Sequence, residues 1–134
     1  MEYIYEIEMY DCGISKRLFI AIKYNNKNLT ILETFINTDI SIREEKILNL
    51  LNNIEKILNG EGEEYDWLGE ICAIYVYKEK CIIVDTLSGY NYDEEYEGYD
   101  YPDATPPDIC DYEEIETIEL KNILVAWYDA ITNN

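Results

Sequence analysis

Residues 69–87 read GEICAIYVYKEKCIIVDTL, and this stretch decides the fold. Its two halves, 69–77 and 81–87, are rich in β-branched and aromatic residues, which favour strands. The polar residues 78–80 separate the halves as a short turn, so the stretch predicts a β-hairpin. Because both halves are almost continuously apolar, we expect central strands that helices cover on at least one face.

The chain before this hairpin alternates between apolar and polar residues. The alternation has a period of two in residues 3–10 and again in 18–24, as in half-buried strands. Residues 11–13 and 25–28 have the composition of turns, and a third apolar run follows at 29–36. The pattern predicts an antiparallel meander of three strands.

Two later stretches have the spacing of amphipathic helices. Apolar residues recur at intervals of three and four between residues 47 and 58, and Ser41 and Glu44 before them have the spacing of a capping box. A second helix is predicted to open near Thr117. The fold class predicted is therefore α+β, with an antiparallel sheet of about five to six strands packed against two amphipathic helices in a single domain, 1–134.

Acidic charge is concentrated in the second part of the chain. The 134 residues include 29 acids and 10 bases, which gives a formal net charge of -19. Residues 1–60 carry nine acids and seven bases, whereas residues 61–134 carry twenty acids and three bases. So acidic a chain repels phosphate, which argues against direct binding to nucleic acid.

The sequence lacks the motifs of common enzymes. Histidine is absent, which excludes histidine-based general catalysis and histidine-containing zinc sites. No P-loop, dinucleotide fingerprint or nucleophile elbow occurs in the chain. Cys12, Cys72, Cys81 and Cys110 form no C-x-x-C pair, so we expect free thiols. We predict a protein that is not an enzyme and that needs no cofactor or metal.

No targeting or membrane segment is predicted. Residues 1–6 lack the basic and apolar regions of a signal peptide, and the longest wholly apolar run, 71–77, is too short to span a bilayer. We therefore expect a cytoplasmic protein that does not bind membranes.

Segment 88–116 combines acids with aromatic residues. It holds eleven carboxylates and six tyrosines and contains no base. Disordered solubilising segments are poor in aromatic residues, whereas tyrosine is enriched at interfaces. We predict an acidic Tyr-rich loop at 88–116 that binds a basic protein partner together with the acidic group at 61–70, where we also expect a loop at 61–66. The expected partner-binding residues are Glu63, Glu64, Asp66, Trp67, Tyr92, Asp93, Glu94, Glu95, Tyr96, Glu97, Tyr99, Asp100, Tyr101 and Asp103.

Other interpretations of this segment stay open. A solvated loop that only keeps the protein soluble would have a similar charge. An acidic calcium-binding module is a further alternative, because Asp93, Glu95, Glu97 and Gly98 match the first positions of an EF-hand loop. The last ligand position of that loop needs a bidentate glutamate and holds Ala104 here.

Three features of the chain point to a class of inhibitor. The chain is small and acidic with an α+β layout, Asp66-Trp67-Leu68 precedes a predicted strand, and an amphipathic helix from Thr117 to Trp127 closes the chain. In these features it resembles the small acidic immunity proteins that bacteria make against polymorphic and contact-dependent-inhibition toxins.

The resemblance implies a non-catalytic inhibitor that binds and blocks a basic nucleic-acid-processing protein, above all a cognate nuclease toxin. The alternative is a phage-encoded nucleic-acid mimic that acts against a defence system such as CRISPR or restriction. Its partner would be a nucleic-acid-guided effector, and the same acidic charge would serve it.

Overall fold

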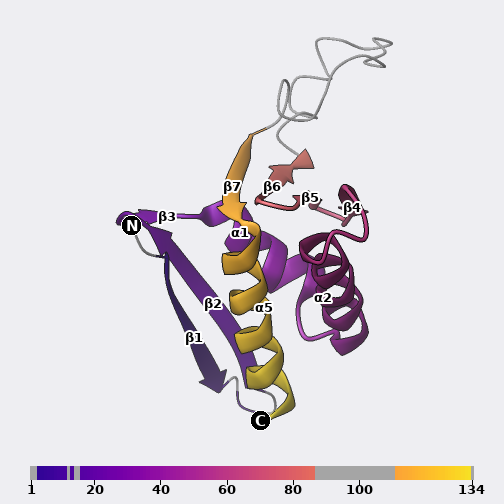
Figure 1. The fold of residues 1–134 in the computed structure, drawn as a ribbon. Helices are drawn as coiled ribbons and strands as arrows, with labels where there is room; N and C mark the ends of the chain where they lie inside the picture. Colours follow the sequence, from indigo (N-terminus) through magenta and orange to yellow (C-terminus); the bar gives the residue numbers. More distant parts are fainter. Residues whose placement is uncertain (1–2, 12, 14–15, 87–110, 134) are drawn as a thin grey trace, which may run out of the picture.

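The computed structural model describes residues 3–11, 13, 16–86 and 111–133, and it divides the strands between two antiparallel sheets (Figure 1). The first sheet has the order β1-β2-β3, and its strands are β1 (Tyr3–Asp11), β2 (Lys16–Tyr24) and β3 (Lys27–Asn28). The second has the order β4-β5-β6-β7, and its strands are β4 (Glu64–Leu68), β5 (Cys72–Tyr77), β6 (Lys80–Asp85) and β7 (Tyr112–Glu116). The predicted α+β class is confirmed.

The predicted third strand at 29–36 is wrong, because this segment is helical. Helix α1 (Thr30–Thr34) continues directly as a π-helix, η1 (Phe35–Ile40). Leu32, Phe35, Ile36 and Ile40 are buried at helical intervals. The β-branched residues of the segment favour a strand locally, but burial of this stripe in the core favours the helix.

Helix α2 (Glu44–Leu58) and helix α5 (Thr117–Thr132) lie where the sequence predicts them. The capping box expected at Ser41 and Glu44 does not form, and α2 begins without a side-chain cap. Ser41 instead has a positive φ of 50°, and its carbonyl accepts a hydrogen bond of 2.8 Å from the indole N–H of Trp127. Ser41 therefore connects the start of α2 to the buried face of α5.

Two strands lie where the sequence predicts loops. Strand β4 falls within the acidic group at 61–70, and strand β7 falls within the segment 88–116. Both are edge strands in which two of the three outward residues are acidic, and this charge gives them the composition of loops. The inward Glu113 of β7 accepts a hydrogen bond of 2.9 Å from the backbone N–H of Leu32, at the start of α1.

One hydrophobic core joins both sheets to the three described helices. Helices α2 and α5 pack against each other, and Lys121 of α5 pairs with Glu55 of α2. Trp127 is fully buried and is the largest side chain of the core. The buried cluster takes residues from every layer, including Ile20, Ile22, Leu32, Phe35, Ile54, Ile74, Ile83, Ile115, Leu120 and Trp127.

A buried carboxylate links η1 to the start of β5. Asp39 is 4% exposed, and its Oδ1 accepts hydrogen bonds from the backbone N–H groups of Glu70 at 3.0 Å and Ile71 at 3.1 Å. Its Oδ2 accepts a third, of 2.7 Å, from the N–H of Cys72. A Cβ atom on Gly69 would lie 2.6 Å from Asp39 Oδ2, so this close approach requires glycine.

Replacing Asp39 with Asn should destabilise the fold by about 2–3 kcal/mol, because the amide NH2 cannot accept and leaves buried N–H groups without a partner. Urea denaturation measures the change. The exposed Asp129 on α5 offers a matched control, and Asp129→Asn should change the free energy of unfolding by less than about 0.5 kcal/mol. Equal effects of the two substitutions would show that the Asp39 hydrogen bonds do not stabilise the fold.

Candidate functional site

The structure describes four of the predicted partner-binding residues: Glu63, Glu64, Asp66 and Trp67. The other ten lie outside the described residues: Tyr92, Asp93, Glu94, Glu95, Tyr96, Glu97, Tyr99, Asp100, Tyr101 and Asp103. Their assignment stays a prediction from the sequence.

The alternation of β4 places its predicted residues on opposite faces of the sheet. Glu64 and Asp66 are exposed on the outer face, whereas Tyr65 and Trp67 are half-buried on the inner face. The Trp67 ring packs edge-to-face on Phe35 with a centroid distance of 5.4 Å, and the Lys46 ammonium lies 5.6 Å from the indole centroid. The structure therefore does not bring Trp67 onto the same face as the two carboxylates.

The strand register carries the outer face across all four strands of the second sheet. In one row, Asp66 lies opposite Tyr75, Tyr75 opposite Ile82, and Ile82 opposite Glu114. Side chains alternate between the two faces along each strand, so the residues two positions before and after this row point to the same face. We call this surface the outer sheet face, and its residues are Glu64, Asp66, Leu68, Ala73, Tyr75, Tyr77, Lys80, Ile82, Val84, Tyr112, Glu114 and Glu116.

Apolar and aromatic side chains lie between the carboxylates of this face. Leu68 is 75% exposed and Tyr112 is 45% exposed, while Tyr75 is half-buried. Ala73 and Val84 lie between Leu68 and Tyr112 in the same row of the outer sheet face, and both are buried. Exposed aliphatic and aromatic groups with a charged rim are typical of protein-binding surfaces.

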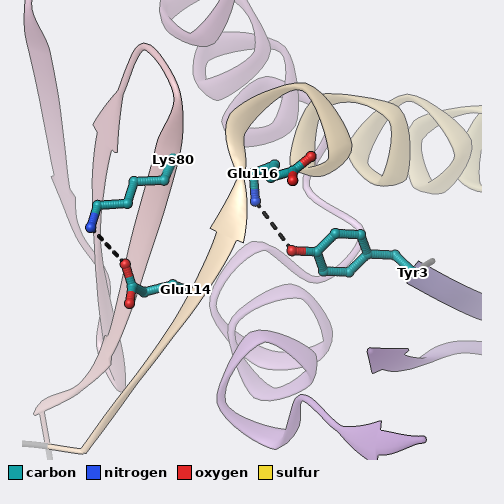
Figure 2. Close-up of polar contacts among 4 residues, drawn as sticks. All are labelled: Tyr3, Lys80, Glu114 and Glu116. Carbon is teal, nitrogen blue, oxygen red and sulfur yellow. Dashed lines mark hydrogen bonds and ion pairs between the residues drawn. The ribbon is translucent and has the colours of Figure 1, made fainter. Parts of the chain in front are cut away.

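The outer sheet face carries four carboxylates and a single base, Lys80. Figure 2 shows that Lys80 pairs with Glu114, with a distance of 2.8 Å between Nζ and Oε1. Both side chains are exposed to solvent, which screens their charges, so this pair contributes little to stability. Glu64, Asp66 and Glu116 have no ion pair among the described residues, so the face is negatively charged.

The backbone of β7 also contacts the first sheet. The N–H of Glu116 donates a hydrogen bond of 3.4 Å to the Tyr3 hydroxyl (Figure 2). The Tyr3 ring stacks on Tyr24 with a centroid distance of 4.4 Å. Burial raises the pKa of Tyr3 above its ordinary value. This contact places β1 at a fixed position beside the junction of β7 and α5.

A hydrogen bond between two neighbouring carboxyl groups, and then their repulsion, raise a carboxyl pKa on this face. A hydrogen bond with Asp66, together with the negative charge of Asp66, raises the pKa of Glu64 above its ordinary value. Burial, and then the charges of Glu64 and Asp66, raise the pKa of Tyr77. A cation placed between the two carboxylates would relieve this repulsion.

The buried cysteines offer no reactive thiol. Burial raises the pKa of Cys72 to about 12 and that of Cys81 to about 11, so both thiols stay protonated. Within residues 3–11, 13, 16–86 and 111–133, no group of three metal-ligating side chains comes together. No helix in the same part of the chain is long and apolar enough to cross a membrane.

Most outer-face residues could not be predicted from a local pattern, because Tyr75, Tyr77 and Ile82 lie in strands that are apolar on both faces. Only the register of β4 and β7 against these strands makes them part of one surface. The three acidic residues among 112–116 indicate an exposed segment, but they do not alternate with apolar residues as in a half-buried strand.

Replacing Asp66 with Asn should lower the pKa of Glu64 toward its ordinary value, because the neighbouring negative charge disappears. Carbon-detected NMR titration of the Glu64 carboxyl measures this pKa. Because the raised pKa means that the folded state holds the proton more tightly, stability falls as the pH rises through it, and Asp66→Asn should remove that loss. An unchanged midpoint for Glu64 would contradict the coupling, and Asp129→Asn serves as the control.

Comparison with known proteins relates the chain to a bacterial protein. Over 103 residues the chain is 28% identical to a protein from Bacillus cereus described as "Immunity protein". The alignment covers 77% of this chain and 71% of that protein. No family model matches the chain, and no solved structure matches it. The resemblance to immunity proteins predicted from the sequence is therefore confirmed, without the type of toxin system.

Proposed function

We propose that this protein is an immunity protein, which binds a cognate toxin and blocks its activity without catalysis. The observation that carries the proposal is the 28% identity to the Bacillus cereus immunity protein over 77% of this chain. The outer sheet face supports it, because a surface of exposed apolar groups and carboxylates suits binding to another protein.

The charge of the chain favours a basic toxin, and we propose a nuclease. A nuclease must bind phosphates and therefore presents lysine and arginine at its nucleic-acid site. The formal net charge of -19 would steer such a toxin toward this protein and speed their association. Nucleic acid itself is repelled by the same field.

The outer sheet face offers suitable contacts for a basic surface. The neighbouring carboxylates of Glu64 and Asp66 could accept hydrogen bonds from one arginine side chain, whose positive charge would relieve the repulsion between them. Tyr75, Tyr77 and Tyr112 would provide amphipathic contact area between the charged groups. The acidic, tyrosine-rich residues 92–103 extend this proposed interface on sequence grounds alone.

Co-expression tests the proposed function. The product of the neighbouring gene is expressed as the candidate toxin in a bacterial host, with and without this protein. Growth should stop with the toxin alone and recover with both, and the purified protein should inhibit the toxin's nuclease activity at a one-to-one ratio. Nuclease activity that persists at a large excess of this protein would contradict the proposal.

Reversing the two adjacent charges should slow association with the toxin. The double variant Glu64→Lys/Asp66→Lys should lower the association rate constant about tenfold at low salt, because these charges steer the encounter. The difference should largely vanish near 1 M salt, where the Debye length is about 3 Å. Stopped-flow or surface plasmon resonance kinetics measure both conditions.

The matched control makes the same change in net charge as the outer-face variant, but at two exposed helix positions. These are Glu44 of α2 and Asp129 of α5. Glu44→Lys/Asp129→Lys should lower the association rate clearly less than the outer-face variant. Equal effects of the two double variants would mean that only the total charge matters, and that the interface lies on another surface.

A further inference from the structure

The hairpin of β1 and β2 has two edges, and the described part of the chain bonds to the backbone groups of only one of them. On the β2 edge, the side-chain amide of Asn37 makes two hydrogen bonds to the backbone of Ile20. It accepts one of 2.9 Å from the N–H of Ile20 and donates one of 3.0 Å to the carbonyl of Ile20. The Glu33 carboxylate accepts from the N–H of Ile22 at 2.8 Å, and the Ile22 carbonyl accepts from the N–H of Leu29 at 2.9 Å. Side chains and backbone from the following segment therefore satisfy this edge.

The same contacts show which groups of β1 point outward. In an antiparallel pair, directly opposite residues either exchange both hydrogen bonds or both point their N–H and C=O groups away from each other. Ile20 lies opposite Ile7 and Ile22 opposite Tyr5, and both β2 residues bond away from β1. Ile7 and Tyr5 therefore point their backbone groups to the free edge of β1, and so does Met9 by the same alternation.

This free edge is long and has no described partner. Strand β1 has nine residues and pairs with β2 alone, and no strand or side chain in the described part of the chain bonds to the outward groups of Tyr5, Ile7 and Met9. Figure 1 shows β1 on the far side of β2 from β3. A strand without proline and with unpaired N–H and C=O groups is a ready template for another strand.

Side chains along β1 define what an added strand would meet. On one face lie Tyr5 and Met9, which are 37% and 40% exposed although they share a face with the half-buried Ile7. On the other face the exposed carboxylates of Glu6 and Glu8 have no ion pair among the described residues. An added strand would therefore place apolar side chains on the first face and basic ones on the second.

A second copy of this chain fits the edge poorly in the longest antiparallel registers. Antiparallel pairing over the full length of β1 would put Glu6 of each copy directly opposite Glu8 of the other. Shifting the register by two residues would put Glu6 opposite Glu6, or Glu8 opposite Glu8. Like charges directly opposite each other destabilise a strand pair.

We propose that the free edge of β1 binds an extended segment of a basic partner protein, as an added strand in which apolar residues alternate with lysine or arginine. The backbone groups of Tyr5, Ile7 and Met9 would pair with this strand, and Glu6 and Glu8 would lie beside its basic side chains. This surface is separate from the outer sheet face, and the proposal does not depend on the proposed function.

The test uses a synthetic nine-residue peptide that alternates lysine with valine, and a matched peptide that alternates glutamate with valine. NMR titration of the full chain should show binding of the lysine peptide and at least tenfold weaker binding of the glutamate peptide. Amide hydrogen exchange at Tyr5, Ile7 and Met9 should be fast in the free protein and slow when the lysine peptide is bound. Absence of binding at millimolar peptide, or slowed exchange elsewhere only, would overturn the proposal.

Two variants separate backbone pairing from side-chain contact. Tyr5→Pro removes an outward N–H that β2 does not use, and it should weaken binding of the lysine peptide at least tenfold. Tyr5→Ala removes the same side chain but keeps the N–H, and its affinity should stay within about threefold. Equal affinities of the two variants would overturn the proposal.

A charge reversal provides a test that is independent of proline. Glu6→Lys/Glu8→Lys should exchange the preference, so that the glutamate peptide binds more tightly than the lysine peptide. An unchanged preference would show that these carboxylates do not lie beside the bound strand.

Discussion

The Asp39 carboxylate is the constraint on which the arrangement of the second sheet depends. It is buried in η1, and it accepts hydrogen bonds from three consecutive backbone N–H groups at the start of β5. Hydrogen bonds to a buried charge are strong because the surrounding dielectric constant is low. They fix where β5 begins, and the register of β4 and β6 against β5 then determines which residues form the outer sheet face.

The surfaces proposed for binding are parts of sheets that one shared core supports. Side chains from the first sheet, the helices and the second sheet belong to a single buried cluster. The hydrogen bond between Tyr3 and Glu116 connects the two sheets at the surface as well. Such a scaffold holds carboxylates and aromatic side chains in place before a partner arrives, which lowers the entropy cost of association.

Strong periodic patterns predicted much of the fold, while weak or charged ones did not. The hairpin of β5 and β6, strands β1 and β2, and helices α2 and α5 follow from spacing alone. The strand predicted at 29–36 was wrong because the apolar pattern of this segment suits either a strand or a helix. Only the row of buried residues that continues to Ile40 decides between the two. The carboxylates of Glu64 and Asp66 were predicted as binding residues, but their aromatic neighbours depend on strand register, which no local pattern contains.

Side-chain accessibility in the toxin complex tests the central claim most directly, namely that the outer sheet face binds the partner. Hydroxyl-radical footprinting compares the free protein with the complex. We expect the modification rates of the exposed Leu68 and Tyr112 to fall on binding, while those of Ile118 and Val125, which are 47% and 40% exposed on α5, stay unchanged. Protection of Ile118 and Val125 with no change at Leu68 and Tyr112 would contradict the account.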